Sequence, residues 1–268
     1  MPPPTEPSRP PTPPPVPTAP LVHTRGDRRT LEFMPGDVQS EMRLSRPAAL
    51  VLAYCRAIMC FALFVPRPRA IVMVGLGGGS LAKFCYRHFP QARITVIELR
   101  ADVIALREQF CVPPDDERFT VVHADAADWL AGAHACADVL VVDGFDSAGL
   151  PPALGTARFY GHCRGALRDG GVLVANIFSY DPRYGTMLAR LRLMFNDRVC
   201  WFERMAGNNH ILFAVKAPAR LDPARPLPRA LRVQRWVARR HGLGSIVLNR
   251  LFARAVVVWL QHRFKRSK

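Results

Sequence analysis

The stretch from Ile71 to Glu98 constrains the fold of this chain more than any other part of the sequence. It begins with the apolar run IVMV, which predicts a buried parallel strand. A glycine-rich turn follows, and then a helical segment, Leu81–Phe89, which Pro90 ends. A second apolar strand, Arg93–Ile97, leads directly to Glu98. This order predicts a β-α-β unit in which the tip of the second strand lies beside the glycine turn.

The spacing of the glycines distinguishes two classes of nucleotide-binding turn. Gly75, Gly77 and Gly79 form a G-x-G-x-G pattern, whereas a dinucleotide fingerprint reads G-x-G-x-x-G and holds a pyrophosphate. The observed pattern resembles motif I of the S-adenosylmethionine-dependent transferases, whose ligand has no phosphate. Glu98 is placed to accept hydrogen bonds from both ribose hydroxyls of such a nucleoside. The alternative is a Gly-rich loop of a Rossmann-like domain that binds nothing.

Strand and helix patterns alternate from residue 71 to residue 216, and two final strands are expected to pair antiparallel. This pattern predicts an α/β fold with a Rossmann-like, doubly wound sheet and helices on both faces. Ligands bind such sheets at the carboxyl ends of the strands. The acids predicted at those ends are Glu98, Asp125, Asp143 and Asp146.

Each of these acids has more than one possible use. Asp125 is placed to accept from the exocyclic amine of adenine, and Ala126 can add a backbone amide; the alternative for Asp125 is to cap the helix that follows. Asp143 ends the apolar strand VLVV and can bind or deprotonate an amine nucleophile. Asp146 can share that task or close an Asx turn.

Segments of different composition flank this sheet. Residues 1–27 are predicted to be a disordered, proline-rich lead. Residues 28–68 are predicted to form a β-hairpin and an apolar helix that spans Pro47 to Phe64. The Rossmann-like domain then covers residues 69–216, and residues 217–268 form a basic linker and an amphipathic C-terminal helix.

The net charge of +16 is concentrated at the C-terminal end, because residues 216–268 hold 14 Lys or Arg and one acid. This tail is expected to dock on the core or a partner, or else to contact a membrane surface or an acidic partner; nucleic acid is not favoured, because no motif for it is present. Seven scattered cysteines indicate reduced thiols and no metal site. No secretory signal or membrane span is visible, so a cytoplasmic protein is expected.

From about Leu31 to Lys216 the chain resembles the spermidine synthase-like (polyamine aminopropyltransferase) family. The resemblance rests on the motifs VQSEM, LAYCRAIM, VGLGGGS, VIELRADVI, HADAADWL and VVDGFDSAGLPPALGTARFY. It implies an S-adenosyl nucleoside as co-substrate, an amine acceptor, no metal and a possible homodimer. It also implies that Glu98 holds the ribose and Asp125 the adenine. Asp143 would activate the amine with help from Asp146, and Gln39 and Tyr54 would lie near the donor.

Two positions depart from the family pattern. The family reads G-G-G-D-G-G, and its Asp binds the ammonium of the aminopropyl donor; Gly78 stands there in this chain. The acid of the family's Y-x-E motif, which helps to hold the polyamine, is Arg56, and a cation there would repel a cationic amine. The first hypothesis is aminopropyl transfer to an amine in polyamine biosynthesis. Methyl transfer from intact S-adenosylmethionine, which Gly78 favours, and a non-catalytic binding protein of the same fold are the alternatives.

Overall fold

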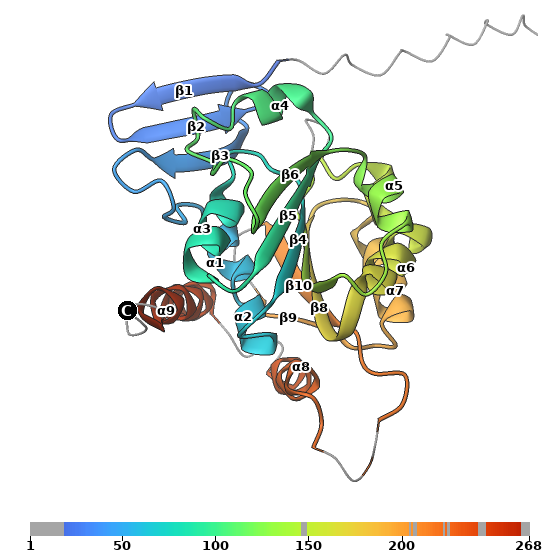
Figure 1. Ribbon diagram of the computed structural model, residues 1–268. Coiled ribbons are helices and arrows are strands. Elements are labelled where there is room, and N and C mark those ends of the chain that lie inside the picture. The colour runs from blue at the N-terminus through green and yellow to red at the C-terminus, as the bar shows by residue number, and fades with distance from the viewer. Residues whose placement is uncertain are drawn as a thin grey trace, which may run out of the picture.

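The computed structural model describes residues 19–145, 149–203, 205, 208–221, 223, 226–240 and 245–263. Its centre is a seven-stranded sheet in the order β6-β5-β4-β7-β8-β10-β9 (Figure 1). In chain order its strands are β4 (Ala70–Val74), β5 (Arg93–Glu98), β6 (Phe119–His123), β7 (Ala137–Val142), β8 (Leu167–Phe178), β9 (Val199–Trp201) and β10 (Asn209–Val215). Strands β4 to β8 pair in parallel, and β10 pairs antiparallel with both β8 and β9. The predicted α/β, doubly wound sheet is therefore confirmed.

Helices cover both faces of this sheet (Figure 1). On one face lie α1 (Ala53–Ile58), α2 (Phe61–Phe64) and α3 (Ser80–His88), and on the other lie α5 (Ala126–Ala131), α6 (Ala157–Ala166) and α7 (Tyr184–Met194). Two short helices, α4 (Ala101–Ala105) and the 3-10 turn η1 (Pro152–Gly155), complete the loops. Alternate residues of β4 enter different cores: Ile71 packs into one and Val72 into the other. This alternation follows from the two-residue period of a strand.

A small antiparallel sheet precedes the main one. It consists of β1 (Leu21–Arg25), β2 (Arg28–Glu32) and β3 (Val38–Arg43). The predicted hairpin is thus part of a three-stranded sheet, and the predicted boundary at residue 27 is wrong, because β1 pairs along its whole length with β2. Residues 1–18, which were predicted to be disordered, lie outside the described residues.

The single helix predicted from Pro47 to Phe64 is also wrong. The structure has α1 and α2, separated by a turn, and a non-helical segment before α1. The Arg56 guanidinium donates to the carbonyl oxygens of Leu50 (2.7 Å) and Val51 (2.6 Å). These bonds occupy carbonyl oxygens of the segment before α1 and stabilise its non-helical conformation. The apolar pattern of the sequence gives no sign of them.

Two helices follow the main sheet, α8 (Arg229–Arg239) and α9 (Ile246–Arg263). The amphipathic helix predicted near the C-terminus is α9, and it docks on the chain's own core through Ala253, Val256, Val257 and Leu260. It packs against α1, while α8 packs against α2 and β9 (Figure 1). Within the described ranges, no helix is both long enough and apolar enough to cross a bilayer.

Candidate active site

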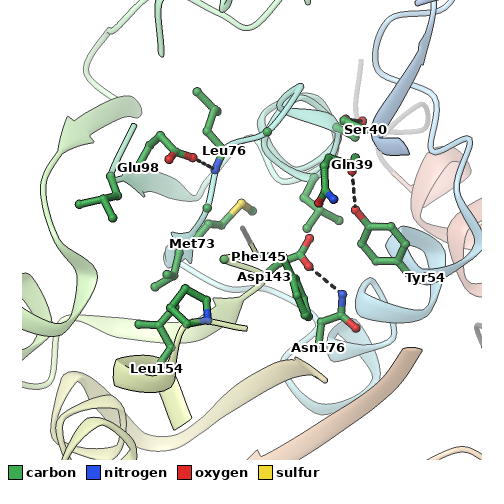
Figure 2. Close-up of a pocket in the computed structure, with 18 of the residues that line it drawn as sticks. Gln39, Ser40, Tyr54, Met73, Leu76, Glu98, Asp143, Phe145, Leu154 and Asn176 are labelled. Carbon is green, nitrogen blue, oxygen red and sulfur yellow. Dashed lines mark hydrogen bonds between the residues drawn. The ribbon is translucent and has the colours of Figure 1, made fainter. Parts of the chain in front are cut away.

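A cavity of about 550 Å³ lies at the carboxyl ends of the central parallel strands (Figure 2). Its walls include most of the residues that the sequence predicted for the site: Gln39, Tyr54, Gly75, Gly77, Glu98, Asp125, Ala126 and Asp143. Gly79 is not among the lining residues, and Asp146 lies outside the described residues. The topology therefore gathers these residues around one cavity, and their binding roles stay predictions.

The glycine turn needs its glycines for two different reasons. Gly75 has φ +93°, and a Cβ there would lie 2.4 Å from the carbonyl oxygen of Asp143. Only glycine lets the turn after β4 pass so close to the turn after β7. Gly79 has φ +64°, and a Cβ there would lie 2.4 Å from a methyl group of Val112. Gly79 therefore serves the packing of α3, which explains why it does not line the cavity.

Glu98 ends β5 and is fixed by the turn beside it. Its Oε2 accepts a hydrogen bond from the amide of Leu76 (2.8 Å), and its Oε1 accepts one from the amide of Arg100 (2.9 Å) (Figure 2). A carboxylate oxygen has two lone pairs, so each oxygen can accept a second bond from the cavity side. Two backbone amides therefore orient the Glu98 carboxylate and leave lone pairs free toward the cavity.

Asp125 performs the helix-capping task that was the alternative to a ligand role. It is the N-cap of α5, and its Oδ1 accepts from the amide of Ala127 (2.6 Å). The residue is exposed and lines the cavity. Capping uses one oxygen, so the other remains available to an amine donor on a ligand, and the two roles are compatible.

Asp143 follows β7 and is held by side chains from distant elements. Its Oδ1 accepts from Nδ2 of Asn176 (2.8 Å) (Figure 2). Oδ1 of Asn176 accepts in turn from Nδ2 of Asn209 (3.1 Å). Burial raises the pKa of Asp143 to about 7, although the hydrogen bond from Asn176 and the neighbouring Tyr54 hydroxyl act in the opposite direction. Within the described part of the chain, the carboxylate has no ion-pair partner. The group is therefore suited to exchange a proton near neutral pH.

Tyr54 lies beside both Gln39 and this carboxyl group. Its hydroxyl donates to the carbonyl oxygen of Gln39 (3.3 Å), and burial beside Asp143 raises the pKa of Tyr54 well above its usual range (Figure 2). The tyrosine thus stays protonated and acts as a hydrogen-bond donor. We call Tyr54, Asp143, Asn176 and Asn209 the acceptor half of the cavity, and the glycine turn with Glu98 and Asp125 the nucleoside half.

Sequence reasoning missed Asn176 and Asn209. Asn176 follows the apolar run VLVA in β8, so it is a polar residue near the carboxyl end of a parallel strand. The same reasoning that selected the acids would have selected it. Asn209 begins β10, an antiparallel strand, and it reaches the site only because β10 pairs with β8. No local signal in the sequence identifies it.

The structure shows the surroundings of Gly78 and Arg56, the two positions that depart from the family pattern. A Cβ at Gly78 would lie 2.6 Å from Oγ of Ser40 and 2.8 Å from the ring of Phe110, so neighbouring side chains fill the space beside this glycine. The expectation that Arg56 places a cation near the amine is wrong. Arg56 does not line the cavity, because its guanidinium is bound to the carbonyls that precede α1.

The cavity that results is acidic. Its walls carry four carboxylates, from Asp37, Glu98, Asp125 and Asp143. Among the residues that the structure describes, the one cation that lines the cavity is Arg100, which forms an ion pair with Asp102 (2.7 Å). An acidic, partly apolar cavity attracts cationic ligands such as ammonium and sulfonium groups. The described residues contain no cluster of three or more metal-type side chains.

Known proteins share this architecture and much of the sequence. Residues 51–181 match the spermine/spermidine synthase domain family. A polyamine aminopropyltransferase of Neisseria meningitidis serogroup A is 37% identical over 180 residues, which cover 66% of this chain and 68% of that relative. A probable spermidine synthase from Corynebacterium glutamicum has the same fold, with a TM-score of 0.65 at 24% identity over 80% of this chain and 82% of that one. Human methyltransferase-like protein 13, solved in complex with SAH, gives a TM-score of 0.53 at 27% identity over 70% of this chain and 89% of that one.

Proposed function

The chain belongs to the spermine/spermidine synthase family of transferases, and we propose that it transfers an aminopropyl group from decarboxylated S-adenosylmethionine to an amine acceptor in polyamine biosynthesis. The observation that carries this proposal is the position of Asp143. It is a carboxyl group with a pKa raised to about 7, without a paired cation among the described residues, and it shares a cavity with the predicted nucleoside residues.

The donor would occupy the nucleoside half. Glu98 would accept from the two ribose hydroxyls, because its carboxylate is already oriented by two backbone amides. Asp125 and the amide of Ala126 would bind the adenine edge. Gln39 and Tyr54 would lie beside the aminopropyl chain, which places the sulfonium carbon between the nucleoside half and Asp143.

The reaction requires an uncharged amine, since an ammonium group has no lone pair to attack with. Ionised Asp143 would accept a proton from the acceptor ammonium. The nitrogen lone pair then forms a bond to the aminopropyl carbon next to sulfur, the C–S bond breaks, and its electron pair stays on sulfur. The products are the extended amine and neutral methylthioadenosine. General-base catalysis of this kind contributes about 10²–10⁴-fold to a rate.

The charge of the cavity supports an amine substrate. Arg56 is turned away from the cavity, so the repulsion expected from it is absent from the acceptor path. Asp37 lines the cavity, and its carboxylate accepts from Nε2 of Gln39 (2.7 Å). We propose that Asp37 supplies the carboxylate for the donor ammonium that the family places at the position of Gly78.

Methyl transfer from intact S-adenosylmethionine is the second candidate function. Gly78 favours it, because the family's acid for the aminopropyl ammonium is missing there and Ser40 and Phe110 fill the space. The similarity to a human methyltransferase-like protein that binds SAH points in the same direction. The two functions differ in the donor, and binding can therefore separate them.

The test is a calorimetric titration of the full chain with decarboxylated S-adenosylmethionine, S-adenosylmethionine and methylthioadenosine. We expect the decarboxylated donor to bind at least tenfold more tightly than the intact amino acid form. A transfer assay with linear diamines and mass-spectrometric detection would then identify the group that is moved. Tighter binding of S-adenosylmethionine, with methylated product, would replace the proposal by methyl transfer. Binding of none of the three would reject both.

A further inference from the structure

A second cavity, of about 410 Å³, shares the segment around the start of α1 with the acidic one. Residues 52–55 line the acidic cavity, whereas residues 49–51 and Arg56 line the second. We call the second cavity the arginine pocket. Its polar lining residues are Arg28, Glu41, Arg43, Arg46, Arg56 and Arg254. They come from the N-terminal sheet, the chain before α1, α1 itself and α9.

The strand register places arginines directly opposite one another. Arg25 pairs with Arg28 between β1 and β2, and Arg28 pairs with Arg43 between β2 and β3. An isolated bridge then pairs Arg43 with Arg46. Residues opposite each other in antiparallel strands point to the same face, and like charges in that arrangement are destabilising. Repulsion within this row of arginines therefore lowers the stability of the unliganded protein.

Two helical arginines add to the row. Arg56 and Arg254 line the same pocket; burial lowers the pKa of Arg56, and the positive charges of Arg254 and Arg250 lower it further. Arg56 uses only Nη1 for its bonds to the carbonyls of Leu50 and Val51. Its other nitrogens keep their donor capacity.

The acids nearby do not balance this charge. Glu41 binds Arg28 (2.5 Å) and leaves a net charge of +4 from the five arginines and one glutamate of the lining. Asp27 lies near Arg28 and Arg43 and offsets part of their charge, and both of its oxygens also accept from Ser45 (2.7 Å each), so the five arginines still outnumber the two acids. Among the described residues, the side chains of Arg43, Arg46 and Arg254 form no ion pair or hydrogen bond; all three are exposed, so a ligand can reach them.

We propose that the arginine pocket binds a phosphate-bearing anion with several negative charges, such as a phosphoanhydride. Guanidinium groups match the geometry of phosphate oxygens with paired N–H donors and are weakly hydrated, so they suit a multiply charged oxyanion. Such a ligand removes the repulsion within the arginine row, and the cavity volume admits a group larger than a single phosphate. The site is separate from the transferase cavity and does not depend on the proposed function.

The first experiment is a thermal and calorimetric titration of the full chain with sodium pyrophosphate, compared with sodium chloride at equal ionic strength. Pyrophosphate should raise Tm by several degrees, and chloride should not. The variant Arg46→Gln/Arg254→Gln should weaken pyrophosphate binding at least tenfold, because it removes two charges from the pocket. Both residues are exposed and lie outside the acidic cavity, so circular dichroism and nucleoside affinity should remain unchanged.

The matched control is Arg232→Gln/Arg235→Gln, which removes the same charge from exposed positions of α8. We call Arg46→Gln/Arg254→Gln the pocket variant. A specific site predicts that pyrophosphate affinity falls in the pocket variant alone, whereas non-specific electrostatic attraction predicts that it falls equally in the pocket variant and the control. The single variant Arg46→Gln, with an intermediate loss expected, serves if the double variant does not fold.

A second arm separates a free anion from a lipid headgroup. The exposed apolar residues of α9, including Val247, Leu251 and Trp259, would allow the phosphate of an anionic lipid to enter the pocket from a membrane surface. Sedimentation with phosphatidylglycerol vesicles, against phosphatidylcholine vesicles, tests this source. Recruitment that the pocket variant reduces and the control does not would support the site with a lipid ligand. No binding of pyrophosphate or vesicles, or equal losses in both variants, would overturn the proposal.

Discussion

The nucleoside half and the acceptor half of the cavity hold their carboxylates in different ways. In the nucleoside half, backbone amides orient the acids: Leu76 and Arg100 donate to Glu98, and Ala127 donates to Asp125. In the acceptor half, side chains from other strands and helices orient Asp143. One half is built by the turns of the β-α-β units, and the other by contacts between elements that are distant in sequence.

In the proposed function, this difference separates nucleoside binding from the proton transfer of the chemical step. Amide donors in a turn fix the direction of a carboxylate, because the backbone that carries them is itself held in place. Asp143 instead has a pKa raised to about 7 by burial. The nucleoside half thus presents carboxylates that backbone amides orient, and the acceptor half presents a group suited to gain and lose a proton near neutral pH.

The largest expected effect tests whether the two halves act independently. Asp143→Asn keeps the size of the side chain and removes its basic oxygen, so we expect turnover to fall about 10²–10⁴-fold. Nucleoside affinity should change by less than about threefold, because the substitution leaves Glu98 and Asp125 in place. Single-turnover rates and calorimetric affinities measure the two quantities. Retention of full turnover would show that Asp143 is not the base.

The next largest effect is expected in the nucleoside half. Glu98→Gln removes the charge that strengthens the hydrogen bonds to ribose, and the loss of about 1.5–3 kcal/mol corresponds to roughly 10–100-fold weaker binding of every S-adenosyl nucleoside. Calorimetric titration checks this. The matched control is Asp128→Asn, which removes an exposed acid of α5 that does not line the cavity. Unchanged affinity in Glu98→Gln would exclude the ribose role.

A smaller effect is expected at Asn176, which acts on the proton equilibrium of Asp143. The hydrogen bond from Asn176 lowers the pKa of Asp143, so Asn176→Ala should raise that pKa further. Less of the carboxylate is then ionised at pH 7, and turnover there should fall by roughly five- to tenfold and recover above pH 8. A pH profile of kcat/KM measures the shift. Asn209→Ala should shift the profile less, since Asn209 contacts Asn176 and not Asp143. A loss that is equal at every pH would contradict this role.

The smallest effect concerns stability. Because the folded-state pKa of Asp143 is raised to about 7, the folded protein holds a proton that the unfolded chain releases above about pH 4. The stability that this carboxyl group contributes is therefore complete below about pH 4 and is lost as the pH rises to 7. Asp143→Asn should raise the free energy of unfolding by about 1–2 kcal/mol at pH 8, or roughly 2–8 °C in Tm, and by less at pH 5. Thermal unfolding at the two pH values measures this difference. If Asp143→Asn were instead less stable than the original protein at pH 8, burial of the ionised carboxylate would not be destabilising.

The positions of the main acids could be predicted because parallel strands impose them. A right-handed β-α-β crossover brings successive carboxyl ends to one edge of the sheet. Reading the strand ends therefore located Glu98, Asp125 and Asp143 without any knowledge of contacts. Reasoning from hydrophobicity failed for the apolar segment before the sheet. It predicted one helix, whereas the structure has α1 and α2 and a non-helical segment before α1, where Arg56 binds the backbone carbonyls.

The sequence by itself determined the α/β class, the glycine turn and the edge of the sheet where the acidic cavity lies, because each depends on the local order of residues along the chain. Only the tertiary structure decided what surrounds those residues. Asn176 and Asp143 are 33 positions apart, and Ser40, which occupies the space beside Gly78, comes from the N-terminal sheet. The direction of Arg56, away from one cavity and into another, is likewise fixed by packing. Strand periodicity extends over a few residues, whereas burial and charge depend on neighbours that the chain brings together only when it folds.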